Sequence, residues 1–181
     1  MRCFAERGIL ATTTADIAAA VGVSHGTVFL HFPTREDLVI AVIDEFGRRL
    51  AAAFARDLPR DASLQGVLDA HLAALREFEP FYARLVAEAP LLPSPVRTTL
   101  FTLQNAVAFE ISRAAAAEEK RGRVRRVAPH LLFNTWIALL HHYLANRELF
   151  APGGSVIAEK GAELRRHFLH LLHPSARRHE S

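Results

Sequence analysis

The sequence has few of the features that strand-rich, disulfide-bonded or membrane-spanning folds require. Gly and Pro occur only nine times each, and segments that alternate polar with apolar side chains, as half-buried strands do, are scarce. A single cysteine, Cys3, excludes an internal disulfide and suits a reducing compartment. No apolar run reaches the roughly 18 residues that a membrane-spanning helix needs, and no signal-peptide pattern opens the chain. We therefore expect a soluble, cytoplasmic protein with no membrane partner.

Ala, Leu, Arg and Glu dominate the composition, and 50% of the residues are hydrophobic. These frequent residues are good helix formers. A chain of 181 residues suits one medium domain, or a small domain attached to a larger one. We therefore expect an all-α protein.

The positive charge is not spread evenly along the chain. The net charge is +3, yet residues 1–50 contain five Arg and six acidic residues. Basic residues gather instead at 120–126, where we expect a solvated loop, and at 165–178, whose end we expect to be a frayed tail. Net charge by itself is therefore weak support for a nucleic-acid partner.

Apolar spacing, capping residues and helix breakers together predict about nine helices. The first ends at Gly8, and Phe4 within it has the character of a core residue. The later helices are predicted at about 13–20, 25–30, 34–57, 62–78, 80–89, 94–118, 129–149 and 156–172. The expected N-caps are a Thr near residue 13, Ser24, Thr34 paired with Asp37, and Ser155.

The stretch from Thr12 to Phe32 predicts two short helices joined by a turn that contains Gly22. The second helix opens with small or hydrogen-bonding residues at 24–27. A helix N-terminus offers free backbone N–H groups and a positive dipole end, which suit a phosphate. Small side chains there allow the helix to enter the major groove of DNA. The spacing alone fits an ordinary helical hairpin capped by Ser24 equally well.

A denser pattern extends over residues 1–38. It consists of FAERG at 4–8, TTTADIAAAVGVS at 12–24, GT at 26–27, HF at 31–32 and REDL at 35–38. In this pattern, which covers about a fifth of the chain, the sequence resembles the DNA-binding domain of TetR-family transcriptional repressors. The resemblance implies a three-helix helix-turn-helix DNA-binding domain at 1–46, followed by a helical ligand-binding and dimerisation domain at 47–181.

Matched residue by residue, the resemblance implies a set of DNA contacts. His25 stands at the family's variable position and is the candidate for reading a base. Phe29 stands where the family usually has Tyr, whose hydroxyl contacts phosphate, and Arg35 stands at the usual Lys position. The residues implied to contact DNA are Thr12, Thr13, Ser24, His25, Gly26, Thr27, Phe29, His31 and Arg35. The residues expected in the core instead are Ile17, Val21, Val28 and Phe32.

The family's first helix normally begins further upstream, often after basic residues. We therefore expect residues upstream of Met1 to complete the helix around Phe4 and to supply positive charge. Each added phosphate contact would raise the salt dependence of DNA binding by about one unit. The alternative function is a helical module that binds a small molecule and has weak or lost DNA binding.

The resemblance also implies a small-molecule pocket within about residues 62–149. Such sites commonly have apolar and aromatic walls with few polar anchors. The candidate ligand contacts are Phe78, Phe81, Tyr82, Phe101, Gln104, Asn105, Asn134, Trp136 and His141. The aromatic residues suit a structural core even better. Gln104 and Asn105 are more specific, because amides on a helix that is apolar on several faces need partners, from a ligand or from another helix.

The last two predicted helices each carry an apolar stripe. Trp136 belongs to the stripe of the helix predicted at 129–149. Such stripes from two chains would form a four-helix bundle, and a helix-turn-helix repressor generally binds two half-sites as a dimer. The predicted dimer interface consists of Leu132, Leu139, Tyr143, Gly161, Leu164, Phe168 and Leu171. The alternative is that both stripes close the core of a single chain.

The sequence provides little support for catalysis or for a metal site. His167, His170 and His173 lie three residues apart, and successive three-residue steps drift by about 60° around a helix, so they cannot share one compact metal site. No Gly-rich phosphate-binding loop occurs. We therefore predict a regulator that is not an enzyme and uses no cofactor or metal. It would be a homodimer that binds operator DNA and is released by a small, largely apolar ligand.

Overall fold

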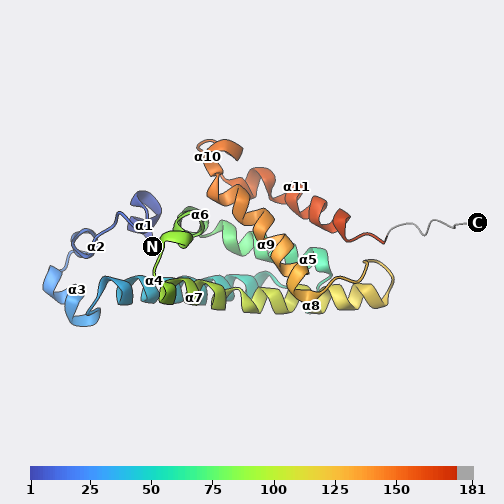
Figure 1. The fold of residues 1–181 in the computed structure, drawn as a ribbon, viewed down its shortest axis with the longest axis horizontal. Helices are drawn as coiled ribbons and strands as arrows, with labels where there is room; N and C mark the ends of the chain where they lie inside the picture. The colour runs from blue at the N-terminus through green and yellow to red at the C-terminus, as the bar shows by residue number, and fades with distance from the viewer. Residues whose placement is uncertain (175–181) are drawn as a thin grey trace, which may run out of the picture.

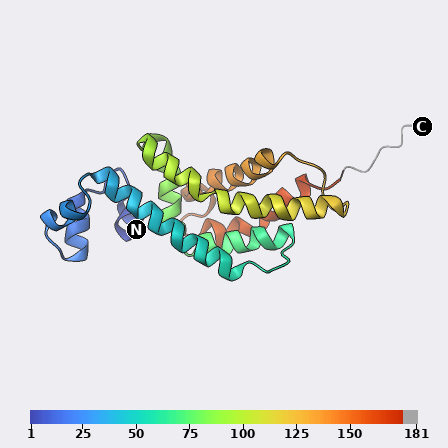
Figure 2. The ribbon, with the colours of Figure 1, turned by 90° about the horizontal axis from the view of Figure 1, so that it is seen from below.

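The computed structural model describes residues 1–174, and no strand occurs among them. Its helices are α1 (Arg2–Arg7), α2 (Thr14–Val21), α3 (His25–His31), α4 (Arg35–Asp57), α5 (Leu64–Arg76), α6 (Glu79–Glu88), the 3-10 helix η1 (Ala89–Leu91), α7 (Ser94–Leu103), α8 (Asn105–Lys120), α9 (Pro129–Ala145), α10 (Arg147–Phe150) and α11 (Val156–Leu171). The molecule is elongated, with α2 and α3 at one end and with α4, α7 and α8 running along its length (Figures 1 and 2). The predicted all-α architecture is confirmed. The predicted basic tail residues Arg177 and Arg178 lie outside the described residues.

Side-chain caps begin the helices where the sequence predicts them. Thr13 with Asp16, and Thr34 with Asp37, form reciprocal capping boxes at the starts of α2 and α4. The Ser24 hydroxyl caps α3 by accepting a backbone N–H at 3.1 Å. Each cap satisfies backbone donors that have no partner inside the helix and contributes about 1 kcal/mol.

The helix-turn-helix formed by α2 and α3 has a very small core of its own. Gly22 joins the two helices with a φ of 72°, a left-handed conformation that a side chain would disfavour. Ala18, Val28 and Leu38 make up the buried cluster. Val21, which was expected to face inward, is 64% exposed, and it is the last residue of α2, directly before the turn at Gly22.

α1 packs against α6, so the small N-terminal unit is attached to the large core at a second place besides α4. Phe4 is 2% exposed and its ring lies 6.4 Å from that of Phe81. Glu88 on α6 accepts the backbone N–H of Leu10 at 2.6 Å. The predicted core role of Phe4 is confirmed, although most of its partners lie far away in the sequence.

α4 connects the two units without a break. The domain boundary that the sequence suggested between residues 46 and 47 lies inside this helix. Phe46 is fully buried, and Gly47 faces α7 at close range. The helix-turn-helix and the large helical unit therefore share one helix.

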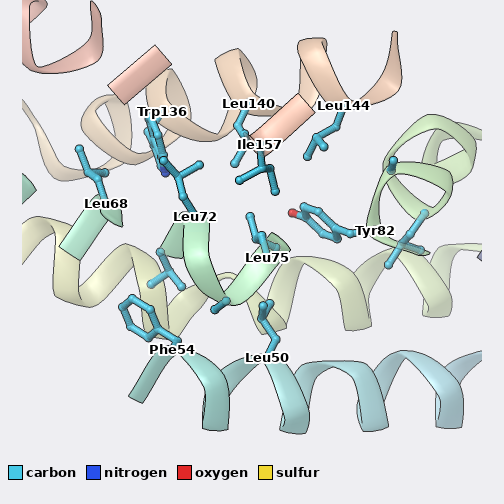
Figure 3. Packing of buried hydrophobic residues seen from close by; sticks show 14 of the residues in the cluster. Leu50, Phe54, Leu68, Leu72, Leu75, Tyr82, Trp136, Leu140, Leu144 and Ile157 are labelled. Atoms are coloured by element: carbon cyan, nitrogen blue, oxygen red, sulfur yellow. The ribbon is translucent and has the colours of Figure 1, made fainter. Parts of the chain in front are cut away.

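The core of the large unit surrounds α5, which packs against α4, α8 and α11. Figure 3 shows side chains from α4, α5, α6, α9 and α11 meeting there. Trp136 of α9 is fully buried and lies among them. Each large apolar side chain that is fully buried contributes about 1.5–3 kcal/mol, so this cluster dominates the stability of the fold.

The helix predicted over 94–118 is in fact two helices, α7 and α8, which meet at Gln104. α7 packs against α4, whereas α8 packs against α5 and α9. The chain therefore changes partners at this residue. The helix predicted over 129–149 is also divided, because α9 ends at Ala145 and the short α10 follows Asn146.

Candidate nucleic-acid interface and ligand cavity

The N-terminal turn of α3 lies at one end of the molecule (Figure 1), and Ser24, His25, Gly26 and Thr27 are all exposed. The Ser24 hydroxyl caps the helix and also lies 2.8 Å from the Thr27 hydroxyl. These two hydroxyl groups hold the turn in shape. His25 and Gly26 form the rest of its surface.

His25 connects α3 to α2. Its Nε2 lies 2.8 Å from Thr14 Oγ1, and its ring meets Phe29 edge-on with centroids 4.7 Å apart. Phe29 is 42% exposed and Leu30, the next residue of α3, is 80% exposed, so two large apolar side chains are exposed on this short helix. Leu30 is not among the predicted site residues, although an exposed apolar residue on a short polar helix is the signal that identifies it.

The two threonines before α2 have different environments. Thr13 is exposed, and its hydroxyl donates to Asp16 at 2.6 Å. Thr12 is 1% exposed and its hydroxyl donates to the Gly8 carbonyl at 2.6 Å. The predicted phosphate contact through Thr12 is therefore wrong, because this side chain is used inside the turn between α1 and α2.

Arg35 is also directed inward. Its Nε donates to the Thr12 carbonyl at 3.2 Å, and its Nη2 donates to the Ile9 carbonyl. These bonds attach the start of α4 to the loop before α2, in place of the predicted contact with phosphate. His31, on the last turn of α3, is exposed.

An internal cavity lies among α4 to α9 in the large unit. Its wall consists of Phe46, Leu50, His71, Tyr82, Leu100, Leu103, Gln104, Val107, Phe133 and Ile137. Its free volume is about 10 Å³, about what a single water molecule needs. Any larger molecule must therefore move the walls apart.

The polar groups at this cavity are largely paired with each other. Trp136 Nε1 donates to His71 Nδ1 at 3.0 Å. The Tyr82 hydroxyl lies 2.7 Å from His141 Nε2. Burial, with a smaller contribution from the neighbouring His141, lowers the pKa of His71 to about 3, and burial lowers the pKa of His141 to about 4. Because burial also raises the pKa of Tyr82, all three groups are neutral near pH 7.

Gln104 is the exception. Its Nε2 is buried and has no hydrogen-bond partner within residues 1–174. The amide lies close enough to the Tyr82 hydroxyl to oppose the burial-driven rise of the Tyr82 pKa, but it makes no hydrogen bond of normal geometry there. A buried donor without an acceptor costs about 1–3 kcal/mol, so this group requires an explanation.

Comparison with known proteins agrees with this arrangement. The sequence model of the family described as "Bacterial regulatory proteins, tetR family" matches residues 1–42. The HTH-type transcriptional regulator RutR of Escherichia coli K12 is 31% identical over 170 residues, which span 90% of this chain and 75% of RutR. The chain belongs to the TetR family of bacterial regulatory proteins.

Other transcriptional regulators are similar over a shorter range or in fold alone. The HTH-type transcriptional repressor Rv3405c of Mycobacterium tuberculosis is 46% identical over 68 residues, which cover 38% of this chain and 36% of that repressor. The match thus spans about a third of the relative's length. A transcriptional regulator from Saccharomonospora viridis in complex with choline has a TM-score of 0.76 at 19% identity, covering 96% of this chain and 93% of that one. The ketosteroid regulator KstR2 of Mycobacterium tuberculosis has a TM-score of 0.69 at 21% identity, covering 96% and 90%.

The pocket residues predicted for this TetR-family chain fall into three groups. Those that line the cavity are Tyr82 and Gln104. Those that pack behind its wall, against Phe46, His71 or Tyr82, are Phe78, Phe81, Trp136 and His141. Those that are exposed and lie outside it are Phe101, Asn105 and Asn134.

The predictions for the third group are therefore wrong. Phe101 is 65% exposed because α7 turns Leu100 toward the cavity in its place. Asn105 is the first residue of α8 after the change of direction, and Asn134 lies on an exposed side of α9. The expectation that Asn105 needs a partner inside the fold does not hold, because both amide side chains are exposed.

The cavity wall also contains residues that the sequence interpretation missed. Phe46 and Leu50 come from α4, well before the segment in which the pocket was expected. His71 lies on the apolar stripe of α5, and a histidine at such a position is the signal that could have identified it.

Most of the predicted dimer residues are inside the chain. The buried ones are Leu132, Gly161, Leu164 and Phe168. Phe168 is fully buried and its ring lies 5.4 Å from that of Trp136. These four predictions are wrong, because the stripes close the core of a single chain, which was the alternative interpretation.

The outer side of α9 and α11 is a different surface. Leu139 and Tyr143 are partly exposed there and, with His167, border a groove of about 550 Å³. Leu171 is 42% exposed. This side of the TetR-family chain, which we call the outer α9/α11 face, is where a partner could contact these three predicted residues.

Two further observations concern the described part of the chain only. Within residues 1–174, no group of three or more His, Cys, Asp or Glu side chains is placed to hold a metal ion. No helix in this range combines the length and apolar character needed to span a membrane.

Proposed function

We propose that this protein is a homodimeric repressor that binds operator DNA and releases it when a small molecule enters the cavity. The observation that carries the proposal is the continuity of α4. Arg35 and Leu38, at its start, contact the helix-turn-helix and the loop before it, while Phe46 and Leu50, at its middle, form part of the cavity wall. Displacing the wall would therefore move the helix-turn-helix, since one regular helix connects them.

In this proposal α3 enters the major groove with its N-terminal turn. His25 reads a base edge, with its ring held in place by Thr14 and Phe29. Phe29 cannot make the phosphate bond of a tyrosine hydroxyl, but it and Leu30 are exposed and suit the methyl groups of thymine. The operator is therefore expected to contain thymine near the base that His25 contacts.

The remaining polar residues of this end are proposed to position the protein on the sugar-phosphate backbone. Thr13 and His31 are exposed at the start of α2 and the end of α3. Gly26 and Thr27 lie on the first turn of α3, where backbone N–H groups and the helix dipole favour an anion. Contacts of this kind set register and orientation, whereas base contacts set specificity.

Dimerisation is proposed to use the outer α9/α11 face. Leu139 and Tyr143 would meet their symmetry mates, since a two-fold interface brings the same patch from both copies together. Two copies arranged in this way would place two α3 helices at half-sites about one helical turn of DNA apart.

Release follows from the small size of the cavity. A ligand larger than the free volume of about 10 Å³ must move helices of the wall apart, and the proposal takes α4 and α7, which pack against each other, as the pair that separates. DNA binding is weakened only if the ligand prefers this separated form to the form that fits the operator. The ligand then shifts the population toward the form that does not bind DNA.

A selection from random duplex DNA tests the proposal. The wild-type protein should enrich a palindrome, and His25→Ala should relax the preference at one base pair in each half-site by about 1–3 kcal/mol. His130→Ala, an exposed residue at the start of α9, is the matched control and should leave the preference unchanged. If no sequence is enriched, the repressor proposal fails and the alternative, a small-molecule-binding helical module, is favoured.

A further inference from the structure

Gln104 is placed to recognise a ligand. It lies at the junction of α7 and α8 and lines the cavity. Its Nε2 is buried and makes no hydrogen bond of normal geometry among the residues that the structure describes, although the Tyr82 hydroxyl is nearby. An amide donor that is buried beside a cavity costs free energy unless a bound molecule accepts its hydrogen bond.

A second polar group at the cavity is also a donor. His71 Nδ1 accepts the Trp136 Nε1–H, so the neutral ring carries its proton on Nε2. Burial keeps this ring neutral, because it lowers the pKa of His71 to about 3. The unpaired polar atom at the cavity is thus the Gln104 Nε2 donor, and His71 carries a second N–H, whereas the Tyr82 hydroxyl of the wall is paired with His141.

Apart from Gln104, His71 and the hydroxyl of Tyr82, the wall is apolar, and none of its residues, all within 1–174, is an Asp, Glu, Lys or Arg. A carboxylate or an ammonium group placed here would lose its hydration and gain no opposite charge, which costs far more than one hydrogen bond returns. The wall therefore selects against charged molecules of either sign.

We propose that the cavity takes an uncharged, mainly apolar molecule with a carbonyl-type oxygen, which accepts a hydrogen bond from Gln104 Nε2. This inference rests on the proposed ligand-responsive function and specifies the chemical class of the ligand. The apolar part of the molecule lies against Phe46, Leu50 and Phe133, between α4 and α9.

Four matched compounds test the class. They are 2-heptanone, its isostere 2-methyl-1-heptene, heptanoate and heptylamine. Binding is measured without DNA, by the thermal midpoint and by the fluorescence of Trp136, the only tryptophan, which is bonded to the cavity residue His71. The ketone should bind about tenfold more tightly than the alkene, as expected for one satisfied buried donor, and also more tightly than either ion. Equal binding of ketone and alkene, or tightest binding of an ion, overturns the proposal.

Substitution locates the interaction. Gln104→Leu should remove the preference for ketone over alkene and leave binding of the alkene intact. Gln65→Leu is the matched control, because Gln65 is the other glutamine of the chain and is exposed on α5. A preference for the ketone that survives in Gln104→Leu contradicts the assignment.

A measurement on the wild-type protein avoids any doubt about folding of the variant. Selective ¹⁵N labelling of glutamine side chains gives signals from two amides only, those of Gln65 and Gln104. Adding 2-heptanone should shift the Gln104 amide and leave that of Gln65 in place. No shift of the Gln104 amide at saturating ketone overturns the proposal.

The test of the ligand class can fail independently of the test of the proposed function. If the ketone binds through Gln104 but operator affinity does not change, the ligand class stands and the release step fails. If DNA binding is confirmed but the alkene binds as well as the ketone, the ligand class fails and the repressor proposal is unaffected.

Discussion

Gly47 of α4 and Leu103 of α7 lie so close that a methyl group at Gly47 would overlap the Leu103 side chain. Leu103 is also part of the cavity wall, one residue before Gln104. A side chain at Gly47 would therefore displace Leu103 and, through it, one part of the cavity wall.

Gly47→Ala should force α7 away from α4. Overpacking costs about 1–3 kcal/mol and alanine returns about 1 kcal/mol of helix propensity, so we expect a net loss of about 1 kcal/mol in the free energy of unfolding. If separation of these helices is the releasing motion, operator affinity should fall without any ligand. Both quantities are measured by urea denaturation and by fluorescence anisotropy with labelled operator.

The double variant Gly47→Ala/Leu103→Ala is the critical control, because shortening Leu103 makes room for the new methyl group. It should recover operator affinity relative to Gly47→Ala alone. Gly66→Ala, where the nearest atom to a new Cβ is Ser63 Oγ at 3.6 Å, should leave DNA binding unchanged. Full operator affinity in Gly47→Ala would show that this contact does not couple the two units.

The buried histidines should make stability depend on pH. His71 and His141 have pKa values of about 3 and about 4 in the folded chain, below the ordinary value of 6.5. The unfolded state therefore binds more protons below pH 6.5. Above about pH 6.5 the two histidines should not lower the free energy of unfolding. As the pH drops from there toward 4, the free energy of unfolding should fall by up to about 1.4 kcal/mol per pH unit for each histidine. Denaturation curves across this range measure the slope.

His141→Gln should reduce that slope, since glutamine does not titrate and can still bond the Tyr82 hydroxyl. The neighbouring His142 is exposed, so His142→Gln should keep the wild-type slope. An unchanged slope in His141→Gln would mean that protonation of His141 does not limit stability.

Glu79 should be essential for docking α11. It is 3% exposed, and its carboxylate accepts the backbone N–H of Val156 at 2.7 Å and of Ile157 at 3.3 Å, and the Ser155 hydroxyl at 2.5 Å. Glu79→Ala leaves these donors unpaired and should lower the free energy of unfolding by about 3 kcal/mol. Thermal and urea denaturation measure the loss. Glu77→Ala, an exposed glutamate two residues earlier, should cost less than about 1 kcal/mol.

The outer α9/α11 face and the buried stripe should respond differently to charge. Leu139→Glu combined with Tyr143→Glu should give a folded monomer, because both residues are partly exposed on one chain. Phe168→Glu should unfold the protein, because it buries an unpaired charge beside Trp136. Sedimentation and circular dichroism distinguish these results. The exposed Phe101→Glu serves as a control, and a dimer that persists in the double variant would rule out this face.

The sequence by itself determined the features that depend only on residues close together along the chain. The caps at Thr13, Ser24 and Thr34 form within three residues of each helix start, so they could be predicted from local chemistry. The end of α4 at Asp57 and the presence of α9 and α11 followed in the same way from spacing and breakers. The pattern at 1–38, which the family comparison supports, is also local.

Only the tertiary structure decided which side of each helix faces a partner. α7 is apolar on more than one face, and contact with α4 selects Leu100 over Phe101. Phe168 and Leu139 both lie on apolar stripes. Phe168 packs against Trp136 and is buried, whereas Leu139 is partly exposed. The break at Gln104 has the same origin, because α7 follows α4 and α8 follows α5 and α9. The unpaired Gln104 amide, on which the ligand proposal depends, exists only because those distant helices meet around it.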